Sequence, residues 1–202
     1  MKRDSINDYG EYVEQQISRS THKWGEETFK RNLPDFQIIS IEVHKITGGV
    51  GNILCLGIRN GNEYWGFKNL PEFKKADIWG VDINPMVNEI IAPHIYCFDF
   101  NHLPVEWESK FDMVYSNSLD HSFKVEETIE EWRRVVKNGG YLYLSLSMAK
   151  KTTKVDVYSF SDEDVDCLFS ANKFELLKSW QNQLPYLKTR GPAKFVLLKV
   201  KK

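Results

Sequence analysis

The sequence is poor in cysteine, in glycine and proline, and in excess charge of either sign. Three of its 202 residues are cysteines, Cys55, Cys97 and Cys167, and they lie too far apart to predict a disulfide framework or a zinc site. Twelve glycines and seven prolines are too few for a collagen-like or linker-dominated chain. A formal net charge of −1 lacks the positive footprint of a protein whose main ligand is a nucleic acid.

Long apolar segments are also missing. No window approaches the roughly 18 apolar residues of a membrane span, and the opening residues have no apolar stretch that would make a signal peptide. Together with the unpaired cysteines, this predicts a soluble protein of a reduced compartment, the cytoplasm. Hydrophobic residues make up 42% and charged residues 27%, as in an ordinary globular domain. We expect a single domain, with its main unit over residues 36–202 and an N-terminal helical lid or cap segment over residues 1–35.

Short apolar runs that suit buried strands recur along the chain, and helical patterns separate them. Five strands alternating with helices predict a parallel sheet, and the short link before the final run predicts that the last strand is antiparallel. The expected fold class is therefore α/β, with a seven-stranded, mostly parallel, Rossmann-like sheet and helices on both faces. The runs cover residues 52–57, 77–82, 94–99, 111–116, 141–147, 173–180 and 194–200.

Local patterns make finer predictions at three places. Residues 36–46 fit the spacing of a helix and that of a strand equally well. The Asn-Gly-Gly run at residues 138–140 predicts a C-terminal cap for the preceding helix. Ser161 followed by Asp164 predicts the capping pair that opens a later helix.

Five motifs, taken in order, resemble class I S-adenosylmethionine-dependent methyltransferases. The resemblance covers roughly residues 50–200, and the closing antiparallel strand is typical of that fold. The wording of the first loop is similar to that of members linked to glycan or polysaccharide biosynthesis. The motifs are CLGIRNG (55–61), GVDINP (80–85), FDFNHLP (98–104), FDMVYSNSLDHS (111–122) and EEWRRVVKNGGYLYLS (130–145).

The resemblance implies that S-adenosylmethionine is the cofactor and that it binds at the carboxyl ends of the first four strands. Gly57 and Gly61, with Asn60 between them, form the first loop, where family members hold the methionine end. Glycine there permits a sharp turn and a close approach of backbone N–H groups to a ligand carboxylate. The ordinary alternative for Gly57 is a turn that only ends a strand.

Polar residues at the next strand ends complete the implied cofactor site. Asp82 would accept the ribose hydroxyls, and Ile83 would lie against the adenine face. Asp99 with Phe100 would recognise the adenine amino group and edge, and Asn117 would lie beside the methyl donor. Taken singly, each acid could be a helix cap or a loop residue, but their occurrence at successive strand ends favours a site.

The first loop departs from the family pattern in two ways. The acidic residue that usually ends the first strand is Cys55 here, and the usual middle glycine is Arg59. Cys55 cannot hold the cofactor's ammonium group, so we expect Glu63 to do so, with Arg59 pairing with a carboxylate. The alternative is a degenerate loop and an inactive, methyltransferase-fold binding module.

Asp120 and His121 follow the fourth strand, where the family places catalytic groups. Methylation of a hydroxyl requires removal of its proton, and an imidazole or a carboxylate in the cleft is the usual base. Either residue could be that base. A metal ion held by Asp99, Asp120 and His121 would lack a distinctive ligand spacing, so we expect none.

These observations predict an S-adenosylmethionine-dependent O-methyltransferase that acts on a hydroxyl of a sugar, as a glycan or monosaccharide, or of another small acceptor. Motifs for a dehydrogenase, a P-loop or nucleic-acid methylation are absent, so we expect no nucleic acid partner. The aromatic N-terminal segment, with Trp24, could fold over the site as a lid. The alternatives are a methyltransferase with a non-sugar acceptor and an inactive binding module. The sequence is also compatible with a homodimer.

Overall fold

The computed structural model describes residues 2–3, 8–22, 33–148, 152, 156–169, 173–181 and 193–202. The α-helices are α1 (Tyr9–His22), α2 (Leu33–Thr47), α3 (Asn62–Lys68), α4 (Val125–Val135) and α5 (Asp162–Leu168). The strands are β1 (Lys2–Arg3), β2 (Asn52–Leu56), β3 (Asp77–Asp82), β4 (Ile95–Cys97), β5 (Phe111–Ser116), β6 (Val136–Ser147), β7 (Tyr158–Ser159), β8 (Phe174–Gln181) and β9 (Ala193–Val200). Short 3-10 turns are η2 (Pro71–Phe73), η3 (Pro85–Glu89), η4 (Val105–Trp107) and η5 (Leu119–His121).

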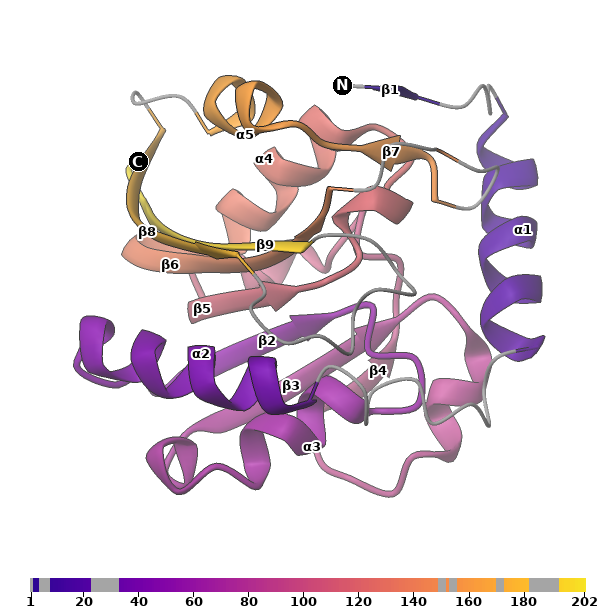
Figure 1. Ribbon diagram of the computed structural model, residues 1–202. Helices are drawn as coiled ribbons and strands as arrows, with labels where there is room; N and C mark the ends of the chain where they lie inside the picture. The colour runs from indigo at the N-terminus through magenta and orange to yellow at the C-terminus, as the bar shows by residue number, and fades with distance from the viewer. Residues whose placement is uncertain are drawn as a thin grey trace.

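Seven strands form one sheet in the order β4-β3-β2-β5-β6-β9-β8 (Figure 1). The first five are parallel neighbours, and β9 runs antiparallel to both β6 and β8. Strands β3 and β4 are added on one side of β2, and the chain then crosses over to add β5 on the other side of β2. The order of the strands therefore reverses between β2 and β5. Ligands of such sheets bind beyond the carboxyl ends of the strands near this reversal. The fold class predicted from the sequence is confirmed.

Helices cover both faces of the sheet, as expected (Figure 1). On one face, Phe36 of α2 packs edge-on against Phe67 of α3 and Tyr115 of β5, with ring centroids 4.8 and 5.2 Å apart. On the other face, the fully buried Trp132 of α4 donates its indole N–H to the Phe100 carbonyl at 3.0 Å. Two cores of apolar side chains therefore hold the central strands, and the strand ends carry the polar residues.

Residues 36–46, which the pattern left ambiguous, belong to helix α2. Phe36, Ile39 and Val43 are 1%, 6% and 0% exposed, whereas Ile38 is 59% exposed. The buried positions follow the i, i+3, i+7 spacing of one helical face, which a strand with alternating sides could not satisfy. Packing against the sheet therefore decides an element that local spacing could not.

The predicted cap at residues 138–140 is wrong, because this Asn-Gly-Gly run lies inside β6. Helix α4 ends at Val135, and Val136 already has extended backbone. Gly139 has φ +76°, and a Cβ on Gly140 would lie 2.8 Å from the Asp112 carbonyl oxygen. The pairing between β5 and β6 shifts register at this place, so the glycines form a bulge under the neighbouring strand. The capping pair of Ser161 and Asp164 at the start of α5 is confirmed.

Helix α1 stands beside the carboxyl edge of the sheet (Figure 1). Its Tyr12 is buried and accepts a hydrogen bond from the Asn101 side chain at 3.1 Å. Trp24 lies outside the described residues, and the predicted lid stays a prediction. Helix α2 begins at Leu33, so the predicted boundary at residue 35 falls within a helix; the division into segments stays a prediction. None of the helices described is both long and apolar enough to cross a bilayer.

Candidate active site

The first loop turns sharply after β2. Gly57 has φ +75°, and a Cβ at this position would lie 2.5 Å from the Ser118 side-chain oxygen. Its N–H donates to the Val81 carbonyl at 2.8 Å. The loops after β2 and β5 are therefore packed so closely that glycine is required here, both for the backbone and for space.

Arg59 adopts the left-handed backbone conformation that the family's middle glycine would adopt without strain. Its φ is +45°, and its N–H donates to Asp82 Oδ2 at 2.7 Å. Gly61 also has positive φ and donates to the Ile58 carbonyl at 2.8 Å, with the half-buried Asn60 between them. The N–H groups of Gly57, Arg59 and Gly61 thus donate to oxygens of the protein, and the predicted approach of first-loop N–H groups to a ligand carboxylate stays a prediction.

Asp82 ends β3 at the centre of this edge and is 6% exposed. Its two carboxylate oxygens accept the N–H groups of Arg59 at 2.7 Å and Asn84 at 2.9 Å. Burial raises the pKa of this carboxyl above its usual value, and the two N–H donors partly offset that rise. Each oxygen keeps a second lone pair, so the side chain can still accept hydrogen bonds from a pair of hydroxyls.

Glu63 lies in the first turn of α3, directly after the first loop, and is hydrogen-bonded to the loop that follows β5. Its Oε1 accepts a hydrogen bond from the Asn117 side chain at 2.8 Å, and the residue is 7% exposed. Burial raises the pKa of Glu63 to about 7, although the Asn117 bond and the nearby Arg59 charge act in the opposite direction. In the part of the chain that the structure describes, Glu63 has no ion pair.

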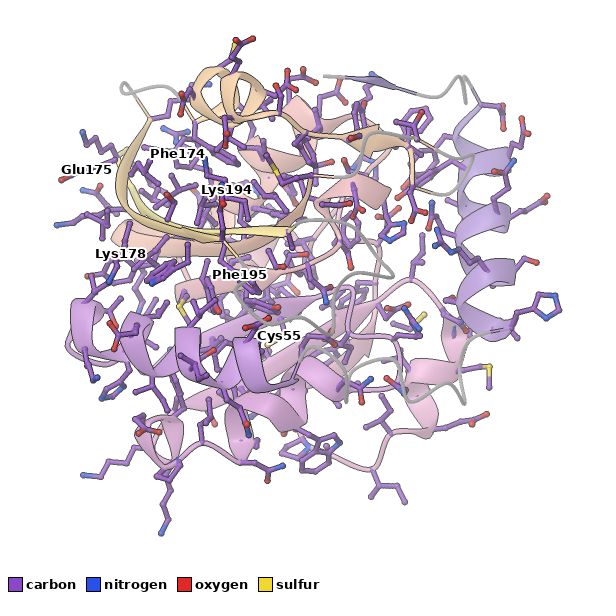
Figure 2. The ribbon with its side chains drawn as sticks, in the orientation of Figure 1. Cys55, Phe174, Glu175, Lys178, Lys194 and Phe195 are labelled. Carbon is purple, nitrogen blue, oxygen red and sulfur yellow. The ribbon has the colours of Figure 1, made fainter. Side chains whose placement is uncertain are left out.

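Cys55 is buried next to the last residue of strand β2, and Figure 2 labels it. Its pKa is raised well above the usual value, first by burial and then by the Glu63 charge. The Glu63 carboxylate therefore lies close to the position that carries an acid in the family. The structure brings together the residue that departs from the pattern and the residue expected to compensate for it.

The residues expected around adenine lie near α1. The Tyr9 hydroxyl donates to Asp99 Oδ2, and Asn101 donates to Asp99 Oδ1 from its backbone and its side chain at 2.8 and 2.6 Å. Phe100 is 7% exposed and packs in the core against Trp132, whereas Ile83 is half-buried. Asp99 and Ile83 thus lie at the edge of the sheet, whereas Phe100 lies in the apolar core beside them.

His121 and Asp120 lie in turn η5, directly after β5. The His121 Nε2 atom is 3.8 Å from Asp120 Oδ1 and 3.4 Å from Asp156 Oδ1. Burial raises the pKa of Asp120, and the Asp156 charge raises it further, while His121 and Arg19 lower it. These three side chains have ligand atoms within 4.8 Å of one another, a spacing that could hold a metal ion; Asp99 is not part of the group.

Sequence reasoning missed the residues that α1 and the chain after β6 bring to this edge. Arg19 binds Asp156 through both guanidinium nitrogens at 2.6 and 3.1 Å, and Asn84 binds Ser20 of α1 at 2.7 Å. The partners in the first pair are 137 residues apart in the chain. No local pattern signals a contact over such a separation.

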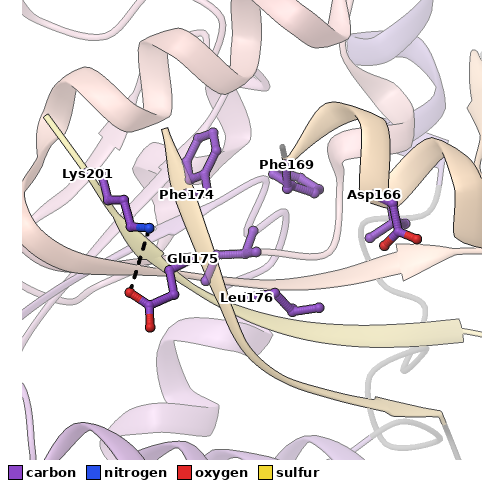
Figure 3. A pocket seen from close by; sticks show the side chains of 8 residues that line it. Asp166, Phe169, Phe174, Glu175, Leu176 and Lys201 are labelled. Atoms are coloured by element: carbon purple, nitrogen blue, oxygen red, sulfur yellow. Dashed lines mark ion pairs between the residues drawn. The ribbon is translucent and has the colours of Figure 1, made fainter. Parts of the chain in front are cut away.

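A hollow of about 300 Å³ lies elsewhere, between α5 and the β8–β9 pair (Figure 3). Phe169, Phe174 and Leu176 line it, and the ion pair of Glu175 with Lys201, at 3.9 Å, lies at its rim. None of the site residues predicted from the sequence lines this hollow.

Comparison with known proteins agrees with this fold. Residues 54–144 match a family described as "Methyltransferase domain". No curated protein matches the chain. The structure of Burkholderia thailandensis 1,6-didemethyltoxoflavin-N1-methyltransferase, with bound 1,6-didemethyltoxoflavin and S-adenosylhomocysteine, is similar with a TM-score of 0.73 at 13% identity, over 98% of this chain and 93% of that one.

Two further solved structures have the same fold. N-methyltransferase NodS from Bradyrhizobium japonicum, in complex with S-adenosylhomocysteine, gives a TM-score of 0.64 at 12% identity over 95% of this chain and 98% of that one. The CurJ carbon methyltransferase gives 0.64 at 12% identity over 83% of this chain and 54% of that one. By name, two of these proteins are N-methyltransferases and the third is a carbon methyltransferase. At these identities the likeness shows the fold alone.

Proposed function

We propose that this chain is a methyltransferase that uses S-adenosylmethionine as its cofactor and methylates a hydroxyl group of a small acceptor, a sugar; the match of residues 54–144 to a methyltransferase domain and the fold shared with methyltransferase structures support the proposal. The main observation behind the proposed cofactor site is the state of the Glu63 carboxylate. It is buried beside Cys55, has an amide as its partner and has a pKa near 7. The pKa of this buried acid is raised in spite of the nearby Arg59 charge, so its ionisation is costly until a further positive group arrives, and the cofactor's ammonium is such a group.

The other residues at this edge fit the remaining parts of the cofactor. Asp82 keeps free lone pairs for the ribose hydroxyls, and Asp99 with Ile83 offers an acceptor and an apolar face for adenine. Since the N–H groups of Gly57, Arg59 and Gly61 donate to oxygens of the protein, the Arg59 guanidinium is the group we assign to the cofactor carboxylate. Asn117 is held by Glu63 next to the expected position of the methyl donor.

S-adenosylmethionine supplies an electrophilic methyl group, so the protein mainly has to align the acceptor oxygen and remove its proton. We assign proton removal to the imidazole of His121, which lies after β5 between two carboxylates. Asp120 is the alternative base. Burial raises the pKa of the Asp120 carboxyl, and its Oδ1 lies 3.8 Å from His121 Nε2, so Asp120→Asn is compared with His121→Ala in the test below.

A sugar acceptor is supported by the near-neutral charge of the chain and by the need for a base. A polyanion would call for a positive surface, which a net charge of −1 does not supply. Sugars present hydroxyls for hydrogen bonding and an apolar ring face for aromatic contacts. The first-loop wording, similar to that of glycan-biosynthesis members, points to the same acceptor class.

The test pairs an acceptor screen with two variants. Wild-type protein and S-adenosylmethionine are incubated with glycosides, nucleotide sugars, phenols, aromatic amines, RNA and peptides, and methylated products are found by mass spectrometry. We expect products from the sugars, and a loss of turnover of about 100-fold or more in His121→Ala with unchanged affinity for S-adenosylhomocysteine. His22→Ala, at the exposed end of α1, is the matched control.

Other outcomes would overturn separate parts of the proposal. Turnover confined to amines, RNA or peptides contradicts the sugar assignment and leaves the methyltransferase in place. Full activity in His121→Ala, with loss in Asp120→Asn, moves the base to Asp120. Binding of S-adenosylhomocysteine without turnover on any acceptor would favour the inactive binding module.

A further inference from the structure

We propose that Asp156, fixed by Arg19 of α1, is a positioning residue that holds the His121 imidazole in place; this inference rests on the proposed function of His121. Asp156 Oδ1 lies 3.4 Å from His121 Nε2, closer than the 3.8 Å of the adjacent Asp120. Asp156 comes from the chain between β6 and β7, so the contact joins two separate parts of the site. A carboxylate at one ring nitrogen fixes the orientation of an imidazole that acts as a base.

Arg19 fixes this carboxylate in turn. Its two terminal nitrogens lie 2.6 and 3.1 Å from the two Asp156 oxygens, which is the fork-to-fork arrangement of a bidentate pair. Both side chains are about one-quarter to one-third exposed. Because the planar guanidinium binds both oxygens at once, it sets the plane of the carboxylate as well as its position.

Helix α1 carries Arg19 and is itself anchored to the loop after β3. The Asn84 side-chain N–H group donates to Ser20 Oγ at 2.7 Å and to Thr21 Oγ1 at 2.9 Å. The Asn84 backbone N–H meanwhile donates to Asp82, the residue assigned to ribose. The positions of Asp82 and of His121 are therefore linked through Asn84, α1, Arg19 and Asp156.

Neither Arg19 nor Asp156 lies within residues 54–144, the stretch that matches the methyltransferase family. The charged groups that act near His121 are Asp120 of η5, Asp156, Arg19 of α1 and Asp82 of β3. Arg19 already supplies a positive charge to Asp156, through both of its carboxylate oxygens. A metal ion on Asp120, His121 and Asp156 would have to compete with the guanidinium.

The first measurement needs no acceptor. The three-bond coupling between the backbone nitrogen and Cγ of His121 is measured by NMR, because it reports the χ1 rotamer of the imidazole. We expect one rotamer in the wild type and averaged couplings in Asp156→Asn and in Arg19→Ala. Asp162→Asn, which removes an acid paired with Lys194 at 2.6 Å on α5, is the matched control and should leave His121 unchanged.

The second measurement uses the first glycoside methylated by the wild type. We expect kcat to fall about tenfold in Asp156→Asn with unchanged KM for S-adenosylmethionine, and to recover in part in Asp156→Glu. The double variant Arg19→Ala, Asp156→Asn should be no slower than Asp156→Asn alone, because Arg19 acts through Asp156.

Two results would overturn the inference. One is a single His121 rotamer in Asp156→Asn; in that case a large loss of turnover in His121→Ala would still support the proposed function. The other is tight binding of Mn²⁺ to the wild type that Asp156→Asn abolishes, which would assign these residues to a metal. If turnover is lost in His121→Ala and is unchanged in Asp156→Asn, the inference about Asp156 has failed while the proposed function of His121 still holds.

Discussion

Beneath the first loop, Glu63 and Asp82 are buried acids whose partners are N–H groups, whereas beside α1 the acids Asp99 and Asp156 are half-buried and are bonded to a tyrosine and an arginine. Both acids of the first kind have a raised pKa because their burial outweighs the N–H donors and the nearby Arg59 charge, which act in the opposite direction. We interpret the first-loop side as the part prepared for a ligand, and the α1 side as the part that the protein's own contacts already hold.

The largest effect should come from Asp82→Ala. The variant removes the acceptor assigned to the ribose and leaves the N–H groups of Arg59 and Asn84 without their partner. Titration calorimetry should show an affinity for S-adenosylhomocysteine about 100-fold weaker than in the wild type. Asp77→Ala, at the exposed opposite end of the same strand, is the control; equal affinities in the two variants would remove the basis for the cofactor site.

Glu63→Gln should weaken binding of S-adenosylhomocysteine about tenfold at pH 8, because the ammonium loses its charged partner.

The Glu63→Gln variant should also change the pH dependence of stability. Ionising Glu63 in the folded state is unfavourable, since its pKa is raised from 4.5 to about 7, so wild-type stability falls as the pH rises through this range. Chemical denaturation should show that Glu63→Gln escapes that fall, while the exposed control Glu89→Gln follows the wild type. A parallel fall in Glu63→Gln would contradict the buried-acid interpretation.

Arg59→Gly separates the backbone of this residue from its side chain. Glycine adopts φ +45° without strain, so the free energy of unfolding should stay within about 1 kcal/mol of the wild type. The affinity for S-adenosylhomocysteine should nevertheless fall about fivefold if the guanidinium binds the carboxylate. Unchanged affinity would show that other groups hold the methionine end.

The smallest effect is expected on the α1 side. Tyr9→Phe removes one donor to Asp99, which keeps its two bonds from Asn101. Thermal denaturation should show a loss of about 1 kcal/mol, and cofactor affinity should change less than threefold. A tenfold change in affinity would mean that α1 takes part in cofactor binding as directly as the first loop does.

Local patterns predicted the elements whose signal lies in neighbouring residues. The strand at residues 77–82 and the strand at residues 111–116 have the predicted bounds. Glu63 lies close enough to Cys55 for its charge to act on it, and its role as a substitute stays a prediction. The run at residues 138–140 misled because glycine serves equally in a helix cap and in a bulge, and the contact with Asp112 that decides between them is distant in sequence.

The α1 side of the site could not be predicted in the same way. Tyr9 with Asp99 and Arg19 with Asp156 are pairs 90 and 137 residues apart, and each residue is an unremarkable surface type on its own. Such contacts arise only from the packing of α1 across the sheet edge. The ligand-facing acids are therefore visible in the sequence, whereas the residues that position them are visible in the fold.

The central claim is that Glu63 is a buried acid that ionises when it receives the cofactor's ammonium. Calorimetry of S-adenosylhomocysteine binding at pH 6, in two buffers with different ionisation enthalpies, measures the protons released on binding. Because the pKa of free Glu63 is about 7, most of the carboxyl is protonated at pH 6, and the account predicts close to one proton released per ligand in the wild type and none in Glu63→Gln. Binding without proton release in the wild type, or equal release in both proteins, would contradict it.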